Sequence, residues 1–103
     1  MAQAPTVLIG FSGPATIRKA DEIADRLKRT LTTSDRIEID CSELEEVDVT
    51  FIQLIAAARK SAAAAGKHMV LSAPAEGCLL EALNRAGIQP TGSQSFWFQG
   101  RTE

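Results

Sequence analysis

The sequence predicts a single α/β domain with an open, largely parallel sheet of about four strands and three or more helices. Segments typical of strands and of helices alternate along the chain, which is the pattern of layered α/β folds. The chain has 103 residues, of which 45% are hydrophobic and 23% charged, and these are the values of one globular domain. We expect one domain over residues 1–103, with its core at about 6–88 and a C-terminal extension at 89–103.

The expected strands are short apolar runs bounded by residues that form turns. Residues 6–11 form a β-branched apolar run that ends before Ser12, Gly13 and Pro14. Residues 36–40 alternate between apolar and polar and lead into a loop over 41–48, and residues 68–72 form a third strand. Residues 94–99 add a short last strand, in which the side chains of Phe96 and Phe98 face the core and that of Trp97 faces away.

Three helices are expected between these strands. Residues 17–31 carry apolar side chains at helical spacing with charged residues on the opposite face. A second helix begins near Val49 or Thr50 and ends before Gly66. A third follows the strand at 68–72, carries Leu79, Leu80, Leu83 and Ala86, and is closed by Gly87.

Composition excludes several classes of function. With 11 basic and 13 acidic residues the net charge is −2, which argues against a nucleic-acid-binding face. The chain shows neither a secretory leader nor an apolar stretch long enough to cross a membrane, so we expect a cytoplasmic protein. Cys41 and Cys78 lie in no metal-binding or redox motif, and His68 is the one histidine. We therefore expect no metal, no cofactor and no enzymatic activity.

The carboxyl ends of the expected strands bring three loops to one edge of the sheet, at residues 12–14, 41–49 and 72–77. Residues 35–48 hold seven acids against one base, Arg36. This run is either a solvated loop that keeps the domain soluble or a surface that attracts a basic partner. The residues expected to form a partner-binding surface at this edge are Ser12, Gly13, Ser42, Glu45, Glu46 and Gln53.

The start of the second helix allows two interpretations. Asp48 can cap the helix, and Thr50 followed by Gln53 has the spacing of a capping box. A hydroxyl in the first turn is also where a phosphate group is stabilised, because free backbone N–H groups and the helix dipole favour an anion there. The residues alone leave both interpretations open.

Four stretches, taken in their order and spacing, resemble a STAS domain, the fold of anti-sigma factor antagonists and of the cytoplasmic tails of sulphate transporters. These stretches are the opening strand leading into residues 13–17, residues 37–40, residues 47–50 at the start of a helix, and residues 66–71 followed by a helix ending at residues 86–88. The likeness covers about residues 6–88. It implies the α/β fold predicted above.

In the antagonists of this family the second helix opens with Asp-Ser-Ser-Gly-Leu, and a partner kinase phosphorylates the second hydroxyl residue. Asp48 matches the Asp, Thr50 matches the phosphorylated residue and Ile52 matches the Leu. Val49 replaces the first Ser, and Phe51 places a large side chain where the family has Gly. The resemblance thus implies that Thr50 is the phosphoacceptor and that Asp48 supports its site.

The function implied by the resemblance is a bacterial protein-binding module switched by phosphorylation. The expected role is an anti-sigma factor antagonist, which binds a kinase-type anti-sigma factor and so releases a sigma factor. One alternative is a module of a chemotaxis or two-component system whose partner is a histidine kinase. Another is a subunit of a lipid-transporting ABC complex, which requires no phosphorylation. None of these roles implies direct contact with nucleic acid or insertion into a membrane.

Overall fold

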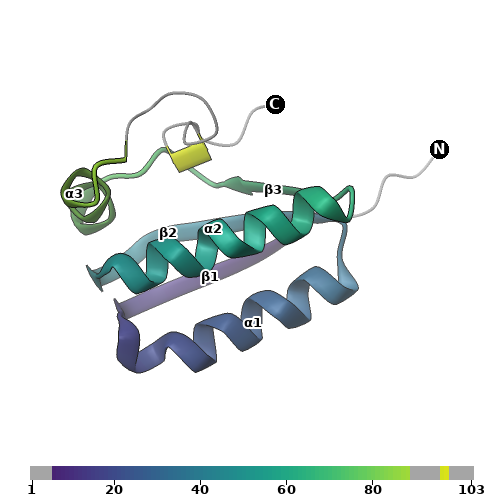
Figure 1. Ribbon diagram of the computed structural model, residues 1–103, viewed down its shortest axis with the longest axis horizontal. Helices are drawn as coiled ribbons and strands as arrows, with labels where there is room; N and C mark the ends of the chain where they lie inside the picture. The colour runs from purple at the N-terminus through teal and green to yellow at the C-terminus, as the bar shows by residue number, and fades with distance from the viewer. Residues whose placement is uncertain (1–5, 89–95, 98–103) are drawn as a thin grey trace.

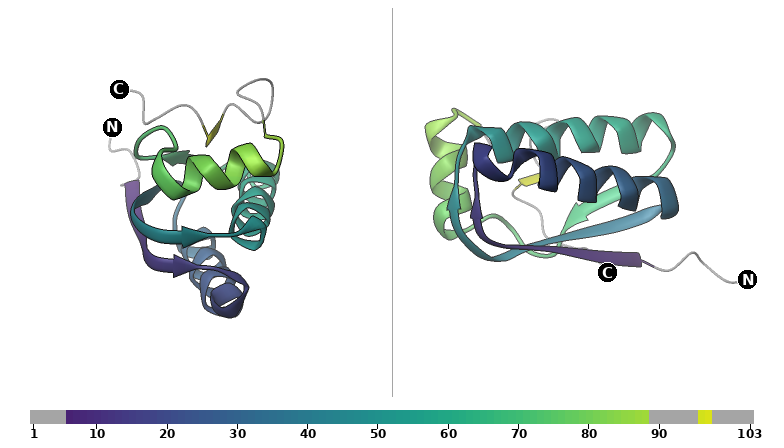
Figure 2. Two further views of the ribbon diagram at one scale, coloured as in Figure 1. Left: turned by 90° about the vertical axis from the view of Figure 1, so that its left-hand side faces the viewer. Right: turned by 90° about the horizontal axis from the view of Figure 1, so that it is seen from below.

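The computed structural model describes residues 6–88 and 96–97, in which strands and helices alternate as the sequence predicts. The elements are β1 (Thr6–Ala15), the 3₁₀ turn η1 (Ile17–Lys19), α1 (Ala20–Thr33), β2 (Arg36–Val47), α2 (Val49–Ala64), β3 (His68–Leu71) and α3 (Gly77–Arg85). Helices α1 and α2 lie along one face of the sheet, and α3 crosses near the ends of β1 and β2 (Figures 1 and 2).

The sheet of the described residues has three parallel strands in the order β1-β2-β3. The parallel α/β architecture is confirmed, whereas the expected count of about four strands is wrong for the described residues, which form three. Exposure alternates along each strand, so that Ile9 and Ile39 are buried against the helices while Leu8 and Val70 are exposed on the opposite face. Core packing therefore lies on one side of the sheet.

Both of the first two strands are longer than predicted. Residues 12–15 continue β1, and residues 41–47, expected to be a loop, continue β2 and pair with β1. Two shifts of register, between Gly10 and Ser12 and between Gly13 and Pro14, absorb the residues that favour turns. Gly13 has a φ of 66°, and Pro14 is tolerated because β1 is an edge strand that needs no donor there.

The predicted last strand falls mostly outside the described residues. Phe96 and Trp97, which are described, form a short helical turn rather than a strand. Both are buried, and the backbone carbonyl of Trp97 accepts a hydrogen bond from the Ala75 N–H at 2.8 Å. Trp97 is 2% exposed, so the expectation that its side chain faces away from the core is wrong.

The first helix begins later than predicted, because residues 17–19 form the tighter 3₁₀ turn. Ile17, expected on the core side, is 68% exposed, whereas Ile23 and Leu27 are buried as predicted. Helix α2 begins at Val49 as predicted and ends near Gly66. The most deeply buried side chains come from the sheet and from α2 and α3: Ile37, Ile39, Phe51, Ile55, Leu71, Leu79 and Leu83.

Candidate functional site

Asp48 joins two segments that are distant in the sequence. Its Oδ1 accepts hydrogen bonds from the backbone N–H of Thr50 at 3.0 Å and of Phe51 at 3.4 Å, which caps α2. Its Oδ2 accepts a third hydrogen bond, from the backbone N–H of Ile17 at 3.0 Å. The carboxylate therefore holds η1 against the start of α2, and it satisfies donors that a helix start otherwise leaves free.

Thr50 is the second residue of α2 and does not cap it. Within the described part of the chain its hydroxyl group takes part in no hydrogen bond, and the residue is partly exposed. The capping-box interpretation of Thr50 and Gln53 is therefore wrong, because Asp48 supplies the cap. The hydroxyl group of Thr50 therefore does not stabilise the start of α2.

The two residues that flank Thr50 point in opposite directions. Phe51 is 0% exposed, and its ring packs edge-on against Phe11 with centroids 5.5 Å apart. Its large side chain therefore fills the core and leaves the surface open at this position. Val49 is 53% exposed, and exposed Ile17 belongs to the turn that Asp48 binds. The start of α2 thus presents exposed aliphatic groups beside the Thr50 position.

The structure brings five of the six expected partner-binding residues onto the paired ends of β1 and β2. Ser12 and Gly13 lie opposite residues 43 and 44 of β2, and Pro14 lies opposite Glu46. Ser42 and Glu45 occupy β2 at the two shifts of register, and both are exposed, as is Glu46. Gln53 lies apart on the exposed side of α2.

A groove of about 500 Å³ runs between the start of α2 and α3. Residues 46–49 line one side, and Ala82, Arg85 and Ala86 line the other. Sequence reasoning did not include the α3 residues, because no local pattern relates them to a helix start that precedes them by more than thirty residues. Arg85 adds a cation to a lining whose other charged residues, Glu46 and Asp48, are acids.

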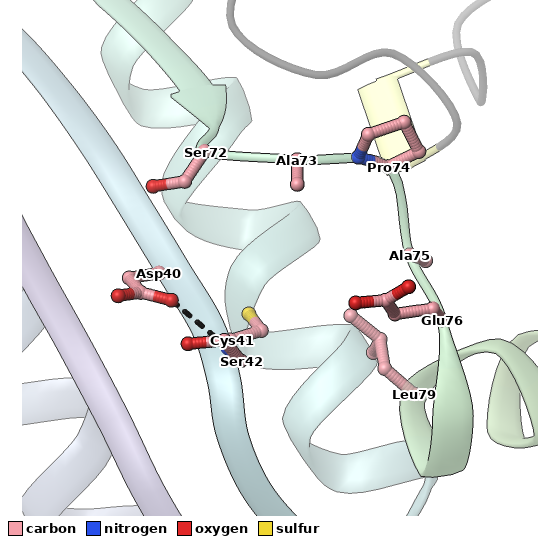
Figure 3. A pocket seen from close by; sticks show the side chains of 9 residues that line it. All are labelled: Asp40, Cys41, Ser42, Ser72, Ala73, Pro74, Ala75, Glu76 and Leu79. Atoms are coloured by element: carbon pink, nitrogen blue, oxygen red, sulfur yellow. Dashed lines mark hydrogen bonds between the residues drawn. The ribbon is translucent and has the colours of Figure 1, made fainter.

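A second, smaller cavity lies between β2 and the segment that follows β3 (Figure 3). Its volume is about 40 Å³, which is too small for an organic ligand. In it the Ser42 N–H donates to Asp40 Oδ1 at 2.9 Å, and this bond lowers the pKa of the Asp40 carboxyl group. Burial, followed by the charge of Asp40, raises the pKa of the Cys41 thiol to about 12. Cys41 therefore stays protonated and is a poor nucleophile.

The described residues form neither a metal-binding cluster nor a membrane-spanning helix. No three His, Cys, Asp or Glu side chains among residues 6–88 and 96–97 are placed to bind a metal ion. No helix in that part of the chain is both long and apolar enough to cross a membrane.

Comparison with known proteins agrees with this fold. A protein-family model described as "Mlab, STAS domain" matches residues 2–90. Among solved structures, the chain is similar to one titled a sulfate transporter family protein from Wolinella succinogenes, with 23% sequence identity and a TM-score of 0.60. The similarity covers 80% of this chain and 66% of that one, which is slightly less than two thirds of its length. No curated protein sequence matches the chain.

The family match spans most of the chain. The parallel sheet, the start of α2 and the order of strands and helices also agree with the resemblance to STAS domains. The chain belongs to the STAS domain family.

Proposed function

We propose that this STAS domain is a non-enzymatic protein-binding module of the cytoplasm, switched by phosphorylation of Thr50. In this role it acts as an anti-sigma factor antagonist: it binds a kinase-type anti-sigma factor, which releases a sigma factor and so regulates transcription. The docking surface comprises the start of α2 and the paired ends of β1 and β2.

One observation carries the proposal: the α2 cap is provided by Asp48, so the Thr50 hydroxyl is available for modification. Asp48 already accepts hydrogen bonds from the Thr50 and Phe51 N–H groups and from Ile17. A phosphate on Thr50 would lie in the first helical turn, where the helix dipole stabilises an anion. The fold is therefore expected to tolerate the modification, whatever its effect on the partner.

The effect on the partner follows from local charge. Glu45 and Glu46 are exposed within five residues of Thr50, and a phosphate would add a charge of about −1.5 to −2 beside them. In the proposed complex, basic groups of the partner face Glu45 and Glu46, whereas an acidic group of the partner packs beside the neutral Thr50. A phosphate on Thr50 would place a bulky group of like charge against that acidic group. Repulsion and lost fit of a few kcal/mol would weaken binding about 100-fold or more.

The direct test is incubation with ATP and the kinase encoded beside the protein, followed by mass spectrometry of the phosphorylated residue. Thr50→Ser should still accept phosphate. Thr50→Ala should bind the kinase constitutively, and Thr50→Glu should fold normally but bind poorly. Phosphate on another residue, or none with an active cognate kinase, would contradict the proposal.

A charge reversal tests the location of the docking surface. Glu45→Lys/Glu46→Lys should weaken the partner complex without lowering the melting temperature appreciably, because both side chains are exposed. Asp25→Lys/Asp35→Lys makes the same charge change at exposed positions on α1 and in the loop after it, outside the proposed surface, and should leave the affinity unchanged. Equal affinities for the two double variants would place the interface elsewhere.

A second candidate is a subunit of a lipid-transporting ABC complex. It is favoured by the matched family model, which is described as "Mlab, STAS domain". In that role the same surface would bind a transporter component permanently, and no phosphate would be needed. Stable co-purification with a neighbouring permease and ATPase, with no phosphate on Thr50, would support this candidate over the antagonist.

A further inference from the structure

The long strand β1 has one free edge in the described part of the chain. It is the outer strand of the sheet, and β2 is its sole partner among residues 6–88 and 96–97. An edge strand turns alternate N–H and C=O groups away from its neighbour, and these groups can pair with another extended chain. At ten residues, β1 offers more such groups than an average strand.

Irregularities and proline, which normally prevent an edge strand from pairing with another chain, are confined to the carboxyl half of β1. Both shifts of register lie beyond Gly10, and Pro14 lacks an N–H group. The amino half, residues 6–10, runs in unbroken register with residues 36–40 of β2. It contains no proline and no charged side chain that would oppose an added strand.

A groove of about 280 Å³ runs along this half of the edge, between β1 and α1. Residues 7–9 of β1 line it together with Arg26, Arg29 and Thr30 of α1, so its lining holds two cations and no carboxylate. The Arg26 guanidinium lies 4.8 Å from the centre of the Phe11 ring. Arg29 donates to Asp25 of its own helix and remains 77% exposed.

The opposite face of the same edge carries one exposed apolar side chain. Leu8 points away from the helices and is 60% exposed, beside Glu38 of β2 in the pairing register. An added strand presents successive side chains to opposite faces. One set of its side chains would therefore meet the two arginines, and the other set would cover Leu8.

We propose that residues 6–10 bind an extended segment of an acidic partner protein, which adds to the sheet as an antiparallel strand. Carboxylate side chains at alternate positions of the segment pair with Arg26 and Arg29, and apolar side chains between them pack on Leu8. The positive charge of the groove favours an acidic segment over a second copy of the chain, because residues 6–10 of another copy would bring no carboxylate to the two arginines.

This surface is distinct from the one proposed around Thr50. Residues 6–10 lie at the beginning of β1, whereas the Thr50 surface involves the ends of β1 and β2. Figure 1 shows α3, which borders the Thr50 surface, at the end of the sheet opposite the start of β1. The failure of one proposal therefore leaves the other intact.

The test is an NMR titration of the isotope-labelled full chain with the synthetic peptide acetyl-Val-Glu-Val-Glu-Val-Glu-Val-amide. We expect shifts of the amide signals of residues 6–10 and of the Arg26 and Arg29 side chains, with slower amide exchange along β1. The same peptide with lysine in place of glutamate should bind about 10-fold more weakly, as expected from two solvent-exposed ion pairs. Added salt should reduce the difference.

A charge exchange makes the test specific. Arg26→Glu/Arg29→Glu should reverse the preference, so that the lysine peptide binds more tightly than the glutamate peptide. Lys28→Glu/Lys60→Glu carries the same charge change at exposed positions outside the groove and should retain the original preference. Circular dichroism of each variant verifies that it folds.

Three results would overturn the proposal. The first is the absence of shifts in residues 6–10 at millimolar peptide. The second is an unchanged preference in the Arg26→Glu/Arg29→Glu variant that remains folded. The third is a concentration-dependent dimer in which β1 amides are protected without peptide, which would make a second copy the occupant.

Discussion

Replacement of Asp48 by alanine should destabilise the domain more than replacement of Thr50 by alanine. The substitution removes the α2 cap, which contributes about 1 kcal/mol, in a range of about 0.5–2. It also removes the acceptor for the Ile17 N–H, 3.0 Å away, and a net hydrogen bond of this kind contributes about 1 kcal/mol. Together we expect a loss of about 2 kcal/mol in the free energy of unfolding.

Urea denaturation followed by circular dichroism measures this loss, with Thr50→Ala as the matched control. Because the Thr50 hydroxyl caps nothing, its removal should change the free energy of unfolding by less than about 0.7 kcal/mol, the range of helix propensity. Asp48→Asn should lie between the two, since the amide oxygen still accepts hydrogen bonds but the charge at the helix start is lost. If Thr50→Ala costs as much as Asp48→Ala, the assignment of the cap to Asp48 is refuted.

Three further predictions concern the core and the buried thiol. Phe51→Ala should cost about 3–5 kcal/mol in urea denaturation, because the ring is 0% exposed and packs on Phe11; a cost below about 1 kcal/mol would mean that the side chain lies on the surface. The raised pKa of Cys41, about 12 against an ordinary 9.0, means that its contribution to stability is complete below about pH 9 and is lost as the pH rises towards about 12. Between roughly pH 8 and pH 10, the free energy of unfolding should therefore fall less in Cys41→Ala than in the unsubstituted protein. Equal decreases in the two proteins would refute the burial of the thiol. Trp97, the one tryptophan, is 2% exposed, so its fluorescence should shift to longer wavelength on unfolding and resist quenching by iodide in the folded protein; ready quenching would contradict its burial.

Local patterns predicted the features that depend on near neighbours. The start of α2 follows from Asp48, whose carboxylate reaches N–H groups two and three residues ahead. The core positions of α1 at Ile23 and Leu27 follow from helical spacing. Both depend on contacts within a few residues, which the sequence displays directly.

The features that sequence reasoning missed depend on distant partners. Residues 41–47 are rich in glutamate and favour a loop, yet pairing with β1 extends the strand through them. The bond between Asp48 and Ile17 joins residues 31 apart, and the groove beside it depends on where α3 packs. Phe96 and Trp97 have the side chains of a strand, but both are buried in a helical turn.

The most direct test of the central claim is the affinity of the kinase-type partner for the protein before and after phosphorylation of Thr50. Isothermal titration calorimetry with the unmodified and the fully phosphorylated protein gives both dissociation constants. A phosphate in the first turn of α2, beside exposed Glu45 and Glu46, should weaken the complex about 100-fold or more while the melting temperature changes little. Equal dissociation constants for the two forms would contradict the proposal that Thr50 is the switch.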